Sequence, residues 1–562
     1  MKEHIIYTIQ QALLRSNRLY GNRTALTLIG EPESTITYHE LQKRVDAFAT
    51  FLLERGIKKN DKFAILAESH PNWAIAYFAI VSIGAIAVPI LPDFSVKEVS
   101  TVLEHSDSIG IVVSAKLMHK ASSFIEHKHP LTIRSGDFAV LSDEKPLQVS
   151  IISTSVDRAR LEACAPEEDD IASIIYTSGT TGASKGVMLT HKNITSNAYA
   201  CRRQFVRLRP GYRMLSILPL SHAYEFTIGL MLGMIEGCEI HYLGKAPAAS
   251  ILLPALKKIR PHIMLSVPLL IEKIYKSSVL PKISSNPKIA HLYGKPIIRK
   301  FINRTIGRKL RQTFGGCLKF FGVGGAALDP NVEVFLKEAK FPYAIGYGLT
   351  ETAPLLAGAG PKQTKPGTTG FALNNVELRI AKTDESSDVG EIQARGPNIM
   401  KGYYRSEQAT AEVFTEDGWF KTGDLGSFDK KRLSIKGRLK TMILGSTGEN
   451  IYPELIEMLI NNHDFVEESL VVPNEDGLSA MIALNFEAMA ENLKTSVNDA
   501  REQASAYLTR IKDMVNAELS KSSKISSVHL QDTPFERTPT LKIKRYLYQL
   551  KEKISHPHNK NN

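Results

Sequence analysis

Short runs of apolar residues alternate along the chain with longer stretches in which apolar residues recur at helical spacing. The runs 63–66, 109–113 and 171–176 have the length of buried strands, whereas residues 39–55 have the pattern of a helix. Alternating strands and helices are typical of α/β proteins with largely parallel sheets. We therefore predict an α/β fold in which several layers pack around parallel-rich sheets.

The stretch 73–91 carries no charged side chain and is long enough to cross a bilayer as a helix. Gly84 and Pro89 divide it, however, and residues 85–90 have the composition of a strand. The pattern therefore favours a buried helix over 72–82 followed by a short buried strand, and not a membrane span.

The chain has 562 residues, which is too long for one ordinary core. Its pattern changes near residues 436–440, and the residues that remain are about as many as one small α/β domain needs. We predict a large N-terminal domain over 1–437 and a small α/β domain over 438–562.

Cysteine usage and the N-terminal residues bear on location. The four cysteines are widely spaced, and none belongs to a CxxC pair or to a cluster with histidines. The N-terminal residues lack the apolar segment and cleavage site of a signal peptide. These features predict a reducing, cytoplasmic location, and the charge pattern adds peripheral membrane attachment as an option.

The net charge is +12, and part of the excess lies between residues 295 and 311, which include no acid. Apolar residues recur there at near-helical spacing, which indicates a basic amphipathic helix that contacts an anionic membrane. A solvated helix whose apolar stripe packs inward explains the pattern equally well. Nucleic-acid binding is disfavoured because no binding motif accompanies the charge. The basic residues are Lys295, Arg299, Lys300, Arg304, Arg308, Lys309 and Arg311.

The strongest chemical signal is the stretch 176–186, which is rich in glycine and hydroxyl groups and follows a strand-like run. Its glycines let the backbone curl, so that hydroxyls and amide groups can surround phosphate oxygens while Lys185 adds a cation. It is not a Walker A loop, because Lys185 is followed by Gly186 and not by Ser or Thr. The candidate phosphate-binding residues are Thr177, Ser178, Gly179, Thr180, Thr181, Gly182 and Lys185.

This stretch resembles the phosphate-binding signature of the acyl-adenylate-forming superfamily, which includes acyl-CoA synthetases, luciferases and peptide-synthetase adenylation domains. Other segments, in the same order and over nearly the whole chain, resemble the remaining motifs of that superfamily. Residues 218–225 and 266–275 are most similar to its long-chain fatty-acid branch. The resemblance implies that a carboxylic acid is activated with ATP as an acyl-adenylate and then passed to a thiol.

The segment 346–352 is similar to the second signature of the superfamily. In that role Thr350 would contact phosphate and Glu351 would bind Mg²⁺, a hard cation for which a carboxylate is a suitable ligand. Read alone, Glu351 is only an exposed acid. The implied nucleotide-binding residues here also include Gly346, Tyr347 and Gly348.

Further segments complete the implied nucleotide site. Gly324, Gly325 and Ala326 follow a strand-like run and are similar to the loop on the adenine side. Asp424 corresponds to the acceptor of the ribose hydroxyls, a role that suits an acceptor-only side chain, although alone it would be read as a turn or cap residue. Arg438 would lie near the ribose.

The resemblance also implies a cycle of two half-reactions. Lys440 would be the hinge about which the small domain turns, and Gly448 and Glu449 would belong to the loop that then meets the thiol. Lys542 is the implied catalytic cation. Leu541 stands before it where many members have Gly, so Lys544 is the fallback, and a solvated basic tail is the alternative for both.

Two features bear on the acid that is bound. His222 would gate entry of the carboxylate, with a buried, hydrogen-bonded histidine as the alternative. The apolar residues 228–234 either line an alkyl tunnel or belong to the core. We predict a long-chain fatty acid–CoA ligase that uses ATP, Mg²⁺ and coenzyme A; the alternatives are an acyl carrier protein as acceptor, or a non-catalytic acyl or nucleotide sensor.

Overall fold

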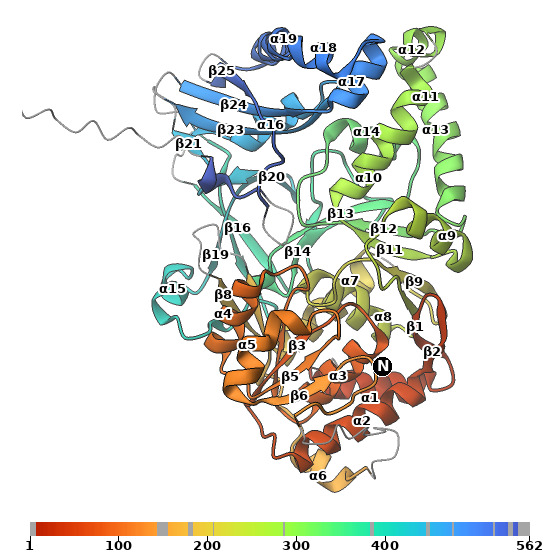
Figure 1. The fold of residues 1–562 in the computed structure, drawn as a ribbon, viewed down its shortest axis with the longest axis vertical. Coiled ribbons are helices and arrows are strands. Elements are labelled where there is room, and N and C mark those ends of the chain that lie inside the picture. Colours follow the sequence, from red (N-terminus) through yellow and green to blue (C-terminus); the bar gives the residue numbers. More distant parts are fainter. Residues whose placement is uncertain are drawn as a thin grey trace, which may run out of the picture.

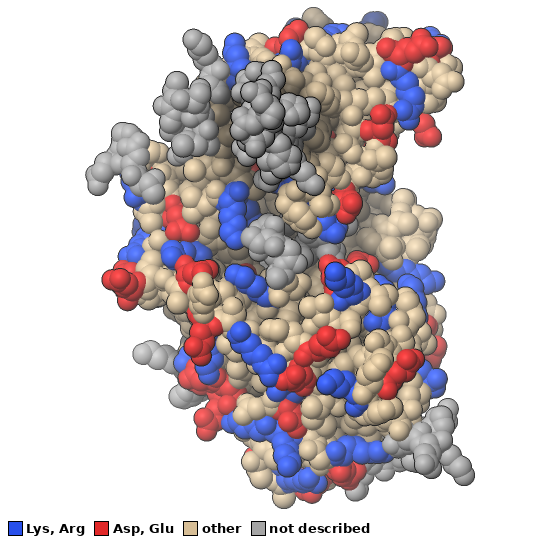
Figure 2. Space-filling model, turned by 60° about the vertical axis from the view of Figure 1, so that its left-hand side comes forward, with Lys and Arg blue, Asp and Glu red and all other residues tan. Residues whose placement is uncertain are grey.

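The computed structural model of the chain shows a large body built from the N-terminal and central residues, with a smaller C-terminal unit, blue in Figure 1, at one end. On the face shown in Figure 2, acidic and basic side chains are interleaved. The structure describes residues 7–142, 156–177, 184–205, 207–284, 287–382, 387–444, 450–474, 477–520, 523–537 and 543–548.

One of two large sheets in the body has seven strands in the order β18-β8-β7-β4-β3-β5-β6. Neighbouring strands run parallel from β7 to β6, while β8 and β18 are antiparallel to their neighbours. The strands are β3 (Lys62–Leu66), β4 (Ile86–Pro89), β5 (Gly110–Val113), β6 (Leu131–Arg134), β7 (Ile171–Thr177), β8 (Lys185–Thr190) and β18 (Gly402–Tyr403).

The other large sheet has nine strands in the order β15-β14-β13-β12-β11-β9-β10-β1-β2. Its strands run parallel from β13 to β1, and the pairings at both edges are antiparallel. The strands are β1 (Thr24–Leu28), β2 (Glu31–Thr37), β9 (Arg213–Ser216), β10 (Glu239–Tyr242), β11 (Ile263–Ser266), β12 (Phe320–Val323), β13 (Tyr343–Gly348), β14 (Leu355–Gly358) and β15 (Phe371–Ala372).

Helix α3 (Pro71–Ser82) is buried along its whole length. It begins with Pro71, whose missing N–H is no loss in the first turn, and the ring of His70 accepts a hydrogen bond of 2.9 Å from the backbone of Asn72. It ends just before Gly84, whose φ of 72° suits glycine. The uncharged stretch is therefore a core helix followed by β4.

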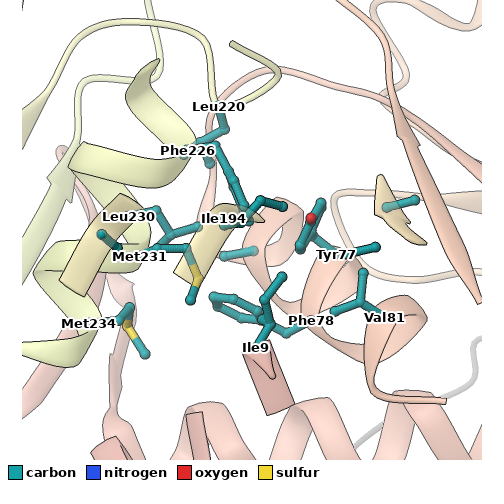
Figure 3. Close-up of a cluster of buried hydrophobic side chains, with 14 of the residues drawn as sticks. Ile9, Tyr77, Phe78, Val81, Ile194, Leu220, Phe226, Leu230, Met231 and Met234 are labelled. Atoms are coloured by element: carbon teal, nitrogen blue, oxygen red, sulfur yellow. The ribbon is translucent and has the colours of Figure 1, made fainter. Parts of the chain in front are cut away.

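Figure 3 shows how α3 packs in the core of the body. Tyr77 and Phe78 lie beside apolar side chains of the π-helix η2 (Glu225–Met231) and of α8 (Leu232–Ile235), and Ile9 and Ile194 close the cluster. Because these elements come from distant parts of the sequence, the cluster joins the two large sheets into one body.

The remaining helices of the body cover the sheets. Helix α2 begins with a capping box in which Thr37 and Glu40 exchange hydrogen bonds, and α4 begins with the same device at Ser95 and Glu98. The helices are α1 (Ile9–Tyr20), α2 (Tyr38–Glu54), α4 (Val96–Ser106), α5 (Met118–Lys128), α6 (Arg158–Ala163), α7 (His191–Gln204), α9 (Ala249–Ile259), α10 (Pro268–Ile274), η3 (Tyr275–Val279), α11 (Leu280–Ser284), α12 (Pro287–Tyr293), α13 (Pro296–Thr313), α14 (Pro330–Glu338), η4 (Thr350–Thr352) and α15 (Glu407–Glu412).

A four-stranded antiparallel sheet leads from the body to the C-terminal unit. That unit packs its helices on the sheet β23-β24-β25 around a hydrophobic core of its own. The elements are β16 (Glu377–Ala381), β17 (Gly390–Arg395), β19 (Phe420–Asp429), β20 (Arg432–Arg438), β21 (Ile443–Leu444), β22 (Asn450–Ile451), α16 (Pro453–Asn461), β23 (Val466–Asn474), β24 (Gly477–Leu484), α17 (Phe486–Leu493), α18 (Val497–Glu502), α19 (Ala504–Glu518), β25 (Ile525–Leu530) and η6 (Arg545–Leu547).

The α/β fold with parallel-rich sheets that the alternating pattern predicts is confirmed. The helix and strand predicted for residues 72–90 are α3 and β4, and the basic stretch 295–311 lies in α13. All four cysteines are free. Within the ranges that the structure describes, no helix combines the length and the apolar character that a membrane span requires.

The α3 cluster yields a stability prediction. Phe78→Ala removes a fully buried ring, and we expect it to lower the free energy of unfolding by about 3–5 kcal/mol, measured by urea denaturation. The matched control is Phe301→Ala, which truncates a ring that is 72% exposed and should change stability by less than about 0.5 kcal/mol. Equal losses in the two variants would show that the cluster does not hold the body together.

Candidate functional site

Of the phosphate-loop residues predicted from the sequence, the structure describes Thr177 and Lys185. Thr177 ends β7, Lys185 begins β8, and the two residues face each other in the antiparallel ladder. The Nζ atom of Lys185 lies 4.7 Å from the centre of the Tyr403 ring, a cation–π distance. Ser178, Gly179, Thr180, Thr181 and Gly182 lie outside the described residues.

Tyr403 connects the first predicted motif to the second. Its hydroxyl donates a hydrogen bond of 2.9 Å to Oε1 of Glu351, while its ring lies under the cation of Lys185. Burial, and then the charge of Glu351, raise the pKa of this hydroxyl above its usual range, so it remains a donor. Lys185 and Glu351 therefore both contact Tyr403, a residue that the sequence motifs did not include.

The position of Tyr403 follows from strand pairing. Tyr403 lies in β18, which pairs with β8 so that Tyr403 faces Val187, and the backbone of Tyr404 donates to the carbonyl of Gly186. The only local signal is a Gly-Tyr-Tyr sequence after residue 401, which does not say which strand it joins. Sequence reasoning therefore had no way to place it beside Lys185.

The segment that carries Thr350 and Glu351 is held by close backbone contacts. A Cβ atom at Gly348 would lie 1.8 Å from the carbonyl oxygen of Pro354, so no other residue fits there without a shift of the backbone. The hydroxyl of Thr352 accepts from the backbone N–H of Leu349 at 3.0 Å and so caps η4. These contacts fix the orientation of η4.

Two buried amide side chains support the same segment. Asn197 from α7 and Asn398 both donate to the carbonyl of Leu355, and Asn398 also donates to the carbonyl of Thr352 at 2.7 Å. The backbone N–H of Met400 donates to the carbonyl of Glu351. Because these donors belong to separate elements, the loop after β13 is tied both to α7 and to the strand-like region before β18.

A second constellation forms around Asp424, whose side chain is 6% exposed. Its Oδ2 accepts a hydrogen bond of 2.9 Å from the hydroxyl of Tyr347, and its Oδ1 lies 3.0 Å from Nε of Arg438. Arg438 faces Asp424 across the β19–β20 ladder. Burial and the charge of Asp424 raise the pKa of Tyr347 far above its usual range, so that hydroxyl stays protonated.

These contacts leave acceptor positions free on both oxygens of the Asp424 carboxylate. A carboxylate has about four acceptor positions, and Tyr347 and Arg438 occupy one on each oxygen. The remaining lone pairs can accept from a pair of hydroxyl groups. Tyr347 and Glu351 lie on one continuous segment, so the two constellations are parts of one site.

Small residues line the wall beside this segment. Gly324 follows β12, and a Cβ atom built on it would lie 3.3 Å from the ring of Tyr224 and 3.7 Å from the carbonyl oxygen of Gly346. Gly325 has a φ of 92°, which favours glycine, and Ala326 is exposed next to it. The predicted adenine-side residues therefore meet Gly346 at the adjacent ends of β12 and β13.

An apolar cavity lies next to Gly346. Tyr224, Ile228 and Leu232 from the η2 and α8 helices form one wall, and Gly322 and Gly346 form part of another. Leu230, Met231 and Met234 instead face the core shared with α3, as Figure 3 shows. One face of this helix thus belongs to the core and the other lines the cavity, while the alkyl tunnel stays a prediction.

The structure describes three of the other predicted residues, His222, Lys440 and Lys544. His222 is half-buried at the start of the helix that carries Tyr224. Lys440 is exposed just after β20. Lys544 lies in the C-terminal unit with its Nζ 3.8 Å from Glu536. Gly448, Glu449 and Lys542 lie outside the described residues.

No group of three or more metal-binding side chains is found where the structure describes the chain. Glu351 is the one carboxylate that both the sequence motif and the contact with Tyr403 single out. A hard cation bound there would need most of its oxygen ligands from the substrate or from water, which is how Mg²⁺ is usually held in nucleotide sites.

The chain is similar to known enzymes over most of its length. The family model described as AMP-binding enzyme matches residues 13–404. The long-chain-fatty-acid–CoA ligase FadD15 of Mycobacterium bovis is 30% identical over 91% of this chain and 90% of its own length. The long-chain-fatty-acid–[acyl-carrier-protein] ligase AEE15 of Arabidopsis thaliana is 27% identical over 95% of this chain and 84% of its own.

Solved structures share the fold. ATP-bound MatB from Rhodopseudomonas palustris superimposes with a TM-score of 0.76 at 22% identity, covering 96% of this chain and 98% of that protein. The o-succinylbenzoate CoA synthetase MenE from Bacillus subtilis, in complex with its acyl-adenylate intermediate, gives a TM-score of 0.74 at 23% identity, with 96% and 97% covered. At these identities the likeness concerns the fold alone.

The contact at Gly348 yields a prediction for the site. Gly348→Ala forces its new methyl group against the Pro354 carbonyl, and we expect a loss of about 1–3 kcal/mol in the free energy of unfolding, measured by urea denaturation. Gly136→Ala is the control, because nothing lies within 4 Å of its added Cβ. Equal unfolding midpoints for the two variants would contradict the tight placement of η4.

Proposed function

The chain belongs to the AMP-binding enzyme family, and from that premise we propose that it is a long-chain fatty acid–CoA ligase. In the first half-reaction an oxygen of the fatty carboxylate attacks the α-phosphorus of ATP, and pyrophosphate leaves. In the second, the thiol of coenzyme A attacks the acyl carbon of the adenylate, loses its proton, and releases AMP.

The observation that carries the proposal is the joining of two polar constellations by one short segment. Glu351, Tyr403 and Lys185 provide a carboxylate, a donor and a cation at one end, and Asp424 lies at the other beside Tyr347. A nucleoside triphosphate has a matching order of groups, with anionic phosphates at one end and a pair of ribose hydroxyls nearer the base.

We assign the residues accordingly. Glu351 would hold Mg²⁺, which when bound neutralises phosphate charge, and Thr350 lies next to it in η4. Asp424 would accept from the ribose hydroxyls while Arg438 keeps its charge compensated. Gly324 and Gly346, with their neighbours, would leave room for a flat base to approach the backbone.

The small unit would supply the second set of groups. We assign the small unit predicted over 438–562 to a mobile domain that turns about Lys440, which is exposed between β20 and β21, while Arg438 stays in the β19–β20 ladder before that pivot. In one position Lys542 would reach the carboxylate and the α-phosphate and stabilise the charge that develops between them. In the other, Gly448 and Glu449 would face the thiol. One site would then serve both half-reactions.

The acyl chain would enter the apolar cavity formed by Tyr224, Ile228 and Leu232. Gly346 lines this cavity, and its carbonyl oxygen lies 3.7 Å from a Cβ atom built on Gly324, so a carboxylate beside Gly346 would be close to the nucleotide. Each methylene buried there contributes about 0.8 kcal/mol, which favours long chains. The names of the similar proteins support the same substrate class.

Coenzyme A is the proposed acceptor, and an acyl carrier protein is the second candidate because one similar protein is a ligase for that acceptor. Thioester formation measured with each acceptor in turn separates them. A non-catalytic sensor of the same fold would bind nucleotide without exchanging pyrophosphate.

The first functional prediction concerns Lys542. We expect Lys542→Ala to lower the fatty-acid-dependent exchange of labelled pyrophosphate into ATP by about 100-fold or more, because a charge-stabilising group is lost, while ATP still binds. Lys544→Ala is the matched control, since Lys544 already faces Glu536. Loss of exchange in the control alone would move the role to Lys544, and exchange retained in both variants would remove it.

The second functional prediction tests the contact between Tyr403 and Glu351. Tyr403→Phe keeps the ring beneath Lys185 but deletes the hydrogen bond that orients Glu351. We expect the Mg²⁺ concentration at half-maximal exchange to rise about tenfold, as for other residues that orient a metal ligand. Tyr404→Phe, one residue further on, should leave it unchanged. An unaltered Mg²⁺ requirement in Tyr403→Phe would argue against Glu351 as the metal ligand.

A further inference from the structure

The positive charge of the chain is concentrated in one long segment. Between Glu272 and Asp329 the sequence has no carboxylate and 12 basic residues, a number equal to the net charge of +12 for the whole chain. The face in Figure 2, by contrast, interleaves acidic and basic side chains. The excess charge therefore belongs to a particular region, which includes α11, α12 and α13 at one edge of the molecule (Figure 1).

Helix α13 has one face fixed against the body. Asn303, Gly307 and Leu310 are buried, and a Cβ atom at Gly307 would lie 2.5 Å from the carbonyl oxygen of Ala339, so the helix backbone lies directly on the end of α14. Arg299 forms a bidentate ion pair with Glu338, at 2.8 Å from its Nη2. These contacts determine which face points outward.

The outward face combines large apolar and basic side chains. Ile297 is 85% exposed and Phe301 is 72% exposed, and they lie one helical turn apart. Lys300, Arg304 and Arg308 are also exposed, and the 3.6-residue period of a helix puts them on the same face. The inward apolar stripe predicted as an alternative exists as well, but Ile297 and Phe301 are not part of it.

Further basic and apolar side chains are exposed on the elements next to α13. Helix α9 lies beside the C-terminal end of α13, where Arg260 donates to the carbonyl of Gly315, and it carries Lys257 and Lys258 as exposed side chains. Leu292 of α12 is exposed just before α13 begins. Neither α9, α12 nor α13 includes an acidic residue.

We propose that the outward face of α13, defined by Ile297, Lys300, Phe301, Arg304 and Arg308, is a docking surface for an anionic phospholipid bilayer. Apolar side chains that enter the interface, next to cations that meet lipid phosphates, are the two attractions that hold an amphipathic helix on such a membrane. The inference does not depend on the proposed function, because binding to lipid needs neither ATP nor acid.

An acidic carrier protein is the other partner that a basic surface attracts. A bilayer fits better, because Ile297 is 85% and Phe301 72% exposed on a helix at the edge of the molecule (Figure 1), so that both side chains extend into solvent. A flat, deformable interface can accept protruding side chains without a complementary pocket.

The test is flotation of the full-length protein with two kinds of vesicle, phosphatidylcholine alone and phosphatidylcholine mixed with phosphatidylglycerol. We expect binding to the anionic vesicles only, weakened by salt. Arg304→Gln with Arg308→Gln should lower the partition coefficient about 30-fold, because each cation near an anionic surface contributes about fivefold. Ile297→Ser with Phe301→Ser should lower it about tenfold or more.

The matched control is Lys97→Gln with Lys128→Gln, which removes the same charge from exposed positions on α4 and α5. Retained binding in the control, together with loss in the α13 variants, supports the proposal. Equal loss in the control overturns the proposal, because charge would then act wherever it lies on the surface. Undiminished binding of the α13 variants overturns it as well, and so does binding of a carrier protein but not of vesicles. Unfolding midpoints in urea, measured for each variant, verify that the fold is intact.

Discussion

The candidate site depends on one tight backbone contact, between Gly348 and the carbonyl of Pro354. The turn between β13 and β14 can close only where the first residue has no Cβ, because that atom would lie 1.8 Å from the Pro354 oxygen. The closed turn places Tyr347 toward β19 and Glu351 toward β18. One short segment therefore contacts Asp424 of one sheet and Tyr403 of another. Asn197 and Asn398 satisfy the carbonyls that the turn buries.

Charge compensation links this segment to the proposed hinge. A carboxylate as buried as Asp424 must have partners, because an unpaired charge in a protein interior is costly. Its cationic partner is Arg438, the last residue of β20, and Lys440 follows two residues later. In the proposed cycle, the pairing of Asp424 with Arg438 must persist while the chain turns immediately beyond it. The β19–β20 ladder, in which these two residues face each other, would be the fixed part of the chain from which the mobile domain turns.

The sequence predicted the elements well where the pattern is local. The interruption of an apolar stretch by Gly84 and Pro89 correctly separated α3 from β4, and the spacing of residues 295–311 correctly indicated a helix. It could not predict contacts between distant segments. Nothing near Tyr403 indicates that β18 joins β8, because the pairing is decided by where both strands lie in the finished sheet. The role of the 228–234 helix was ambiguous for the same reason, since its two faces look alike in sequence and differ only in what covers them.

The contact between Lys185 and Tyr403 has a consequence for nucleotide binding in the proposed function. A lysine between a strand and a glycine-rich loop has many rotamers, and ordering it costs up to about 2 kcal/mol. Here the cation already lies over an aromatic ring, an interaction of about 0.5–2 kcal/mol that offsets part of that cost before any ligand arrives. A triphosphate attracts the same cation more strongly, because it offers full negative charges. Tyr403 would thus hold Lys185 near the phosphate position without competing for it, and through its hydroxyl it would hold Glu351 as well.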